Sequence, residues 1–232
     1  MKIKKESVIR LIKLLIIICA VFAVIAAYEF NIIPSRKYTA EDFGIDIVRS
    51  PVDFDNDGLD DYTELLYGAQ KDAANHPSYN GKYWPDGGYP PDDIGVCTDV
   101  IWRAFREAGY SLRDMVDKDI TIYPEDYPEA DPDINIDFRR VNNLEHFFDK
   151  YAIKRSTDIN EIDQWNPGDI VIFNNGAHIG MVSAFRNRKG IPYIIHNGGQ
   201  PVRNEDYLKR GKVYKHYRFD ASQIDENVLV KW

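Results

Sequence analysis

The residue best suited to nucleophilic chemistry is Cys97, which begins an apolar-periodic segment over residues 97–108. The thiolate is the reactive form of cysteine, and the free amide groups at a helix start favour that form. The same amide groups can receive the oxyanion of an acyl-transfer reaction. Cys97 is therefore a candidate nucleophile, although cysteine usage alone is equally consistent with a buried, inert thiol.

A cysteine nucleophile normally needs an imidazole, which a third polar group orients. His178 begins a predicted strand after a turn, and His196 ends the next predicted strand. Histidines at facing ends of adjacent antiparallel strands can meet at one rim of a sheet. From spacing alone, such a pair can equally bind a metal or play an ordinary polar role. We expect His76 and His146 at the surface, and His216 in a structural role within the last strand.

A second candidate site is the acidic segment "DFDNDGLDDYTE" at residues 53–64, which matches the calcium-loop template D-x-D-x-D-G-x5-E in full. Regularly spaced carboxylates around a turn glycine can surround one hard cation with oxygen atoms. The predicted ligands are the side chains of Asp53, Asp55, Asp57, Asp61 and Glu64 and the carbonyl group of Leu59. Pro51 disfavours an entering helix and no second loop follows, so the segment is closer to isolated extracellular calcium loops than to an EF-hand. A solvated acidic helix start is the alternative.

Several helices and strands must position these residues. Apolar spacing and capping residues predict helices over residues 61–74, 97–108 and 142–150. Strands are predicted over residues 170–173, 179–183, 193–195 and 213–217. Helices followed by an antiparallel run of strands indicate an α+β fold. The acidic, proline-containing stretch of residues 114–137 is expected to be a long surface insertion.

The loop of residues 76–91, just before Cys97, is rich in aromatic side chains. They are Tyr79, Tyr83, Trp84 and Tyr89. Aromatic residues in such a loop can line a substrate groove or pack over the core, and the sequence favours neither.

The N-terminal segment has the pattern of a secretory signal or an uncleaved anchor: basic residues followed by an apolar run over residues 14–28. Counting back to Val8 brings the run to the length that crosses a bilayer, about 17–25 residues. We expect an uncleaved single-pass anchor, with cleaved secretion as the lesser possibility. The basic flank belongs on the cytoplasmic side, which places the rest of the chain outside the cytoplasm.

Net charge and cysteine count restrict the function of the residues that follow the N-terminal segment. The first 34 residues are basic overall, so the rest is more acidic than the whole-chain charge of −8, which argues against nucleic-acid binding. A single cysteine outside the apolar run cannot form an intramolecular disulfide.

We expect an anchor and linker over residues 1–34, the acidic loop and its helix over residues 35–75, and the domain of Cys97 over residues 76–232.

Four motifs carry a resemblance to a known superfamily. The helix-start cysteine, "PGDIVIF", "HIGMVS" and "IIHN" together resemble the NlpC-type cell-wall cysteine peptidases, which are papain-like α+β proteins. The fuller set, with "GGYPPDDIGVCTDVIWRAFREAG" and "DFRRVNNLEHFF", is similar to the bacterial family known as domain of unknown function 1287, grouped with that superfamily. The resemblance spans roughly residues 72–219. It implies Cys97 as nucleophile, His178 as general base and acid, and His196 as the orienting residue, with Asn197 as an alternative for that last role.

The resemblance, together with the predicted location of the domain outside the cytoplasm, predicts a membrane-anchored extracytoplasmic cysteine hydrolase. Its expected reaction is cleavage of an amide bond in peptidoglycan stem peptides, with no cofactor for catalysis and a structural calcium ion. The expected partners are the cell-wall peptide and, through the N-terminal helix, the membrane. Two other functions stay open: an acyltransferase or lipid-amide hydrolase on the same scaffold, and a non-catalytic, calcium-stabilised surface binding module.

Overall fold

The computed structural model describes residues 5–30, 32–33, 36–127 and 131–232. Lys2 and Lys4 of the basic flank, and the linker boundary at residue 34, lie outside the described residues. The chain divides into two compact units, residues 1–35 and 36–232. The structure draws no division between residues 75 and 76, because the helix that ends there packs against the helix of Cys97.

The first unit is helix α1, Lys5–Glu29. Its segment Glu6–Glu29 is long and apolar enough to cross a membrane, and the most apolar part of this segment is not buried. At 1.5 Å per residue these 24 residues extend about 36 Å, more than the roughly 30 Å of a bilayer core. A signal sequence has the same length and composition, so the structure establishes an N-terminal apolar helix that suits either role.

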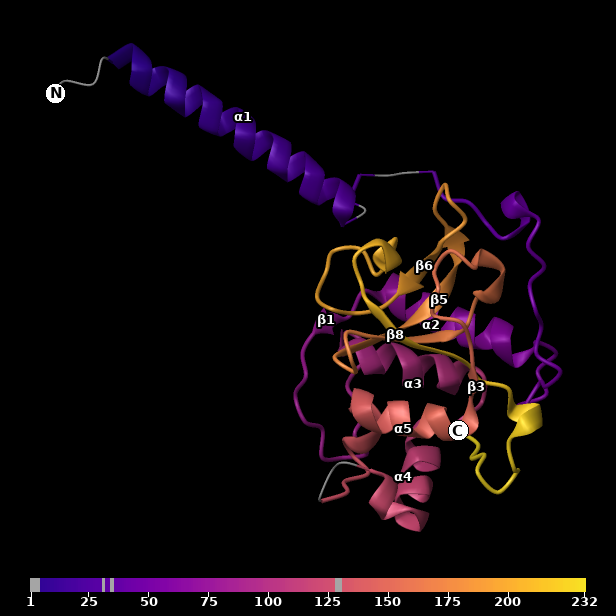
Figure 1. Ribbon diagram of the computed structural model, residues 1–232. Coiled ribbons are helices and arrows are strands. Elements are labelled where there is room, and N and C mark those ends of the chain that lie inside the picture. The colour runs from indigo at the N-terminus through magenta and orange to yellow at the C-terminus, as the bar shows by residue number, and fades with distance from the viewer. Residues whose placement is uncertain (1–4, 31, 34–35, 128–130) are drawn as a thin grey trace. The chain divides into compact units, whose positions relative to one another are not determined.

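The second unit is built on a six-stranded sheet with the order β3-β8-β4-β5-β6-β7, in which every neighbouring pair is antiparallel (Figure 1). The strands are β3 (Ile153–Lys154), β4 (Ile170–Phe173), β5 (His178–Arg186), β6 (Pro192–Ile195), β7 (Asn204–Glu205) and β8 (Val213–Arg218). The four predicted strands correspond to β4, β5, β6 and β8. Two short strands, β1 (Ser78–Tyr79) and β2 (Ile94–Gly95), form a separate parallel pair.

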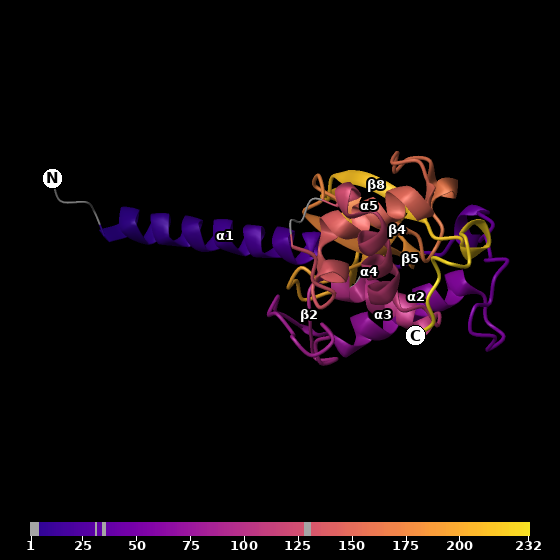
Figure 2. The ribbon, with the colours of Figure 1, turned by 90° about the horizontal axis from the view of Figure 1, so that it is seen from below.

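The helices of this unit are α2 (Asp61–Asn75), α3 (Cys97–Glu107), α4 (Leu112–Ile122) and α5 (Val141–Tyr151). Figure 1 shows α3, α4 and α5 on one side of the sheet, and Figure 2 shows α2 running beside α3. Short 3-10 turns complete the described secondary structure: Glu41–Phe43, Pro124–Asp126, Asp137–Arg139, Ile162–Gln164, Tyr207–Lys209 and Ala221–Gln223. The mixed α+β class with an antiparallel sheet is therefore confirmed.

Strand alternation divides the buried apolar residues between the two faces of the sheet. Ile170 and Ile172 of β4 pack into the main core with the helices. Val171 and Phe173, the residues between and after them, pack on the opposite face with Trp165. Because β4 and β6 are buried along their whole length, these two strands read as continuous apolar runs in the sequence.

The expectation of a surface insertion over residues 114–137 is wrong for its first part. Helix α4 begins at Leu112, and its residues Met115, Val116 and Ile120 are fully buried in the main core. The spacing of these apolar residues is helical, but the aspartates between them conceal it in a reading that weighs acidity and proline content.

Candidate active site

Cys97 is the first residue of α3, and a buried ion pair fixes the start of that helix. The Asp99 carboxylate accepts the backbone N–H of Val96 at 2.6 Å and the indole N–H of Trp102 at 2.7 Å. Arg139 binds the same carboxylate through two N–H groups, at 2.7 and 3.0 Å. Both charged groups are buried. The "DFRR" motif therefore supplies the counter-charge that holds the helix start in place.

The thiol of Cys97 is 7% exposed and forms no disulfide. Burial raises the pKa of the thiol to about 11, against the opposing effect of the backbone N–H groups of Ile179, Thr98 and Cys97 itself. Burial thus outweighs the helix-start amides that favour the thiolate. The contact with Ile179 is informative, because this residue directly follows His178. It places the thiol at the beginning of β5, beside the predicted base.

The two predicted histidines meet. His178 Nε2 lies 2.8 Å from His196 Nδ1, and the rings are nearly perpendicular, at 86°. The register of β5 on β6 pairs Met181 with Ile195, which sets the two imidazoles diagonally across neighbouring strands. The two histidines therefore lie together at one rim of the sheet, as their positions at strand ends predicted.

Gly180 permits this approach. It lies two residues after His178 on β5 and opposite His196, and a Cβ atom there would lie 3.0 Å from the Cβ of His196 and 2.7 Å from Ile194 Cγ2. Contacts this short require the neighbouring strand to shift. The glycine of "HIGMVS" is therefore required for the packing of His196 against β5.

A residue that the sequence analysis missed completes the chain of contacts. Glu205, fully buried on β7, lies with its Oε1 atom 2.9 Å from His196 Nε2 and forms an ion pair with Arg210. Strand β7 pairs with β6, Ile194 opposite Glu205, and this pairing brings the carboxylate to His196. Pairing of this two-residue strand is the only signal that would have identified Glu205.

These contacts determine where the protons lie. A carboxylate only accepts hydrogen bonds, so His196 donates from Nε2 to Glu205 and accepts at Nδ1 from His178 Nε2. Neutral His178 then carries its lone pair on Nδ1, which has no hydrogen-bond partner among the described residues. Burial, and secondarily His196, lowers the pKa of His178 to about 3. Burial also lowers the pKa of His196, against the effect of Glu205. Near neutral pH both imidazoles are therefore uncharged, and Nδ1 of His178 carries the lone pair that a proton would have to join.

Asn197, the alternative orienting residue, is engaged elsewhere. Its amide nitrogen donates to the backbone carbonyls of Gly95, at 3.0 Å, and Pro77, at 3.3 Å. Its Oδ1 atom accepts the N–H of Gly199. The contact with His178 comes from His196, and Asn197 instead ties the end of β6 to the segment that leads into Cys97.

The other histidines are placed as expected. His216 is buried, bonds to Asp169 at 3.0 Å and stacks on Trp165 with ring centroids 4.0 Å apart, which is a structural role. His146 is exposed on α5, and exposed His76 contacts the carbonyl of Pro201.

Three of the aromatic residues before Cys97 differ in their contacts, and one of them, Tyr89, has the core-packing role that was considered. Tyr89 packs against Trp102, Phe138 and Trp232 over the core. Tyr83 donates a hydrogen bond to Asp133 and holds a neighbouring loop. Tyr79 is 55% exposed, and burial and the nearby Cys97 raise the pKa of its hydroxyl. Tyr79 is therefore the member of this group whose hydroxyl is close enough to Cys97 for the thiol to influence its pKa.

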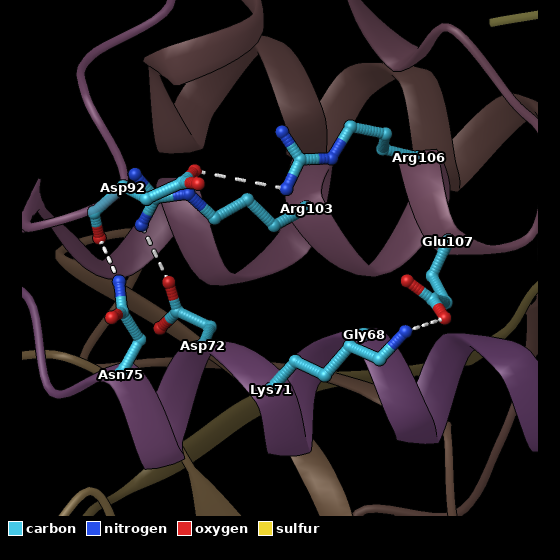
Figure 3. A pocket seen from close by; sticks show the side chains of 8 residues that line it. All are labelled: Gly68, Lys71, Asp72, Asn75, Asp92, Arg103, Arg106 and Glu107. Atoms are coloured by element: carbon cyan, nitrogen blue, oxygen red, sulfur yellow. Dashed lines mark hydrogen bonds and ion pairs between the residues drawn. The ribbon is translucent and has the colours of Figure 1, made fainter.

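A charged pocket between α2 and α3 is neutralised by its own side chains (Figure 3). It is lined by Gly68, Lys71, Asp72, Asn75, Asp92, Arg103, Arg106 and Glu107. Its ion pairs are Arg103 with Asp72, Lys71 with Glu107, and Arg106 with Asp92. Buried Arg103 also donates to the carbonyls of Pro91 and Ile94, so this pocket supports the segment that leads into Cys97.

The acidic loop brings together four of its six predicted ligands. Carboxylate oxygens of Asp53, Asp55, Asp57 and Glu64 all lie within 4.8 Å of one another. Asp61 is not among them: its carboxylate accepts the N–H of Phe54 at 3.0 Å and the hydroxyl of Tyr110 at 2.6 Å. Leu59 donates its N–H to Asp57 at 2.9 Å.

Comparisons with known proteins agree with the sequence motifs. The family described as "Domain of unknown function (DUF1287)" matches residues 66–219. The chain is also similar to the "Uncharacterized protein YijF" of Escherichia coli K12, with 40% identity over 150 residues that cover 62% of this chain and 72% of the relative. No solved structure matches the chain.

Proposed function

We propose that this chain, which belongs to the family described as "Domain of unknown function (DUF1287)", is an extracytoplasmic cysteine hydrolase of the papain-like NlpC type that cleaves an amide bond. The hydrogen bond between His178 and His196 carries the proposal. It leaves the Nδ1 atom of a neutral imidazole unpartnered among the described residues, and the thiol at the start of α3 contacts the backbone N–H of Ile179, the residue that follows His178. This arrangement is that of a nucleophile, its base and an orienting group.

The first step is attack on the amide carbonyl. A bond forms between Cys97 Sγ and the carbonyl carbon while the thiol proton passes to His178 Nδ1. Because burial raises the pKa of Cys97 and lowers that of His178, the resting pair is neutral, and proton transfer accompanies the attack. The backbone N–H of Cys97, at the free end of α3, is positioned to donate to the oxyanion.

The second step releases the amine. His178 returns its proton to the leaving nitrogen, the carbon–nitrogen bond breaks, and a thioester to Cys97 remains. A water molecule then attacks the thioester carbonyl and gives a proton to His178. The acid product leaves and the thiol regains its proton. His196 and Glu205 hold the tautomer of His178 throughout and contact no substrate atom in this scheme.

The substrate class rests on the resemblance to NlpC-type cell-wall peptidases and on the apolar helix α1. A single-pass anchor with the basic flank inside would hold residues 36–232 at the outer face of the membrane, next to cell-wall peptides. Tyr79, which is exposed and close enough to Cys97 for the thiol to influence its pKa, is available to contact a peptide. The proposed substrate is therefore an amide bond of a peptidoglycan stem peptide.

The test compares wild type with Cys97→Ser on purified peptidoglycan, with mass spectrometry of the released fragments. Cys19→Ser is the matched control, because it removes the other thiol and lies in α1. We expect new carboxyl and amino ends with wild type and Cys19→Ser, and none with Cys97→Ser. A product with a new amide in place of the carboxylate would assign acyl transfer. Equal fragment patterns from all three proteins would refute both reactions and favour a binding module.

A further inference from the structure

The acidic loop before α2 has no part in the proposed reaction, yet its geometry is that of a cation site. Asp53, Asp55 and Asp57 come from the loop and Glu64 from the first turn of α2, and their carboxylate oxygens lie within 4.8 Å of one another. Calcium binds oxygen ligands at 2.3–2.6 Å, so oxygens on opposite sides of one ion lie about 4.6–5.2 Å apart. The spacing of the four carboxylates fits a single calcium ion.

Glu64 gives an independent indication of a missing ligand. Its side chain is 2% exposed, and its Oε2 atom has no hydrogen-bond partner in the described part of the chain. Burying an unpaired carboxylate is strongly unfavourable. Capping of α2 does not require this side chain, because Asp60 already accepts the N–H of Thr63.

The backbone of the loop is arranged around its aspartates. Asp53 accepts the N–H groups of Asp57, at 3.1 Å, and Gly58, at 2.9 Å. Positive φ angles at Asn56 (65°) and Gly58 (99°) form the turn. The three loop aspartates are exposed or half-buried, so water can complete the six to eight oxygens that calcium requires.

The loop is attached to the far end of the helix that carries Cys97. Phe54 stacks on Tyr110 with ring centroids 4.0 Å apart. Asp55 packs directly against Gly109, just beyond the end of α3, where a Cβ atom would lie 2.7 Å from that of Asp55. Asp61 joins the start of α2 to Tyr110 through its hydrogen bond.

We propose that Asp53, Asp55, Asp57 and Glu64 bind one calcium ion, which fastens the start of α2 to the C-terminal end of α3. The site is separate from the reaction at Cys97, and its occupancy stabilises the unit of residues 36–232 whether or not that reaction takes place.

The first experiment measures calcium binding to the full-length chain, purified in detergent and freed of metal with EDTA. Isothermal titration should give one Ca²⁺ per chain. Thermal unfolding should shift upward by roughly 5–10 °C when calcium reaches about 100 times its dissociation constant. The weakest extracellular calcium sites have dissociation constants of about 1 mM. If 10 mM calcium, about ten times that value, gives neither binding heat nor a thermal shift, the proposal is overturned. An equal shift with magnesium would overturn the assignment to calcium.

The second experiment compares four substitutions. Asp57→Asn and Glu64→Gln should each abolish the calcium-dependent shift, and Asp46→Asn, an exposed aspartate outside the cluster, should retain it. In EDTA, Glu64→Gln should melt no lower than wild type, because the amide has nearly the same size as the carboxyl group and cannot become charged at this buried position. A purely structural Glu64 would instead give a lower melting temperature with the calcium shift intact, and this result would contradict the proposal. Cys97→Ser must keep the wild-type calcium response.

Discussion

Substitution of Glu205 by glutamine tests whether the buried carboxylate controls the protons of the active site. Glutamine has nearly the same size, but its NH₂ group can donate to His196 Nε2 and reverse the hydrogen bonds. His196 would then donate from Nδ1 to His178 Nε2, and the proton of neutral His178 would move to Nδ1. The nitrogen that must accept the thiol proton would no longer be free.

The magnitude follows from the bond that is lost. Glu205 Oε1 lies 2.9 Å from His196 Nε2, and a hydrogen bond to a charged group contributes about 1.5–3 kcal/mol. At about 1.36 kcal/mol for each factor of ten, Glu205→Gln should lower kcat roughly 10- to 150-fold. KM should change little, because Glu205 is fully buried and two residues removed from the reacting atoms.

Two assays check this expectation. Turnover is measured on the substrate whose cleavage depends on Cys97, and ¹⁵N NMR of labelled histidine reports which nitrogen of His178 carries the proton. Glu107→Gln is the matched control, because it makes the same replacement in an ion-paired carboxylate of the pocket beside α2. Unchanged kcat together with an unchanged His178 tautomer in Glu205→Gln would refute the reasoning, as would an equal loss in the control.

Three further predictions concern the same site. Gly180→Ala should destabilise the fold by about 1–3 kcal/mol, because the added methyl group clashes with β6, and it should displace His196. Chemical denaturation should therefore show lower stability, and the turnover assay should show lower activity. Full activity would contradict the packing argument. Arg139→Met should reduce the free energy of unfolding, measured by chemical denaturation, by about 3–5 kcal/mol, because it leaves the buried Asp99 carboxylate without its ion-pair partner. A loss below about 1 kcal/mol would show that solvent reaches the Asp99 carboxylate. Since burial raises the pKa of Cys97 to about 11, iodoacetamide alkylation should accelerate continuously from pH 7 towards pH 11, and a plateau reached by pH 7 would indicate a preformed thiolate instead.

The sequence was informative where function depends on regular elements. Cys97 at a helix start and His178 and His196 at strand ends could be located because apolar periodicity defines those elements, and antiparallel pairing then brings the histidines together. Glu205 could not be located, because its strand has two residues and its partner is defined only by pairing with β6.

Tertiary contacts decided the remaining differences. Asp61 occupies a ligand position of the calcium template, but its carboxylate is used by Tyr110, 49 residues later in the chain. Local spacing contains no information on such a partner. Helix α4 was missed for the opposite reason: its apolar face was present in the sequence, but the aspartates between the apolar residues dominate the composition.

The position of Glu205 in the sheet has a dynamic consequence. Strand β7 is one of the two edge strands of the sheet, and among the described residues its partner strand is β6. Edge strands open locally at a lower free energy than the centre of a sheet, without global unfolding. When β7 frays, His196 loses its acceptor while β4 and β5 remain paired, so the fraction of molecules with a correctly protonated base equals the fraction in which this edge is closed. Amide hydrogen exchange at Asn204 and Glu205 would therefore measure the fraction of otherwise folded molecules in which the proposed base keeps this tautomer.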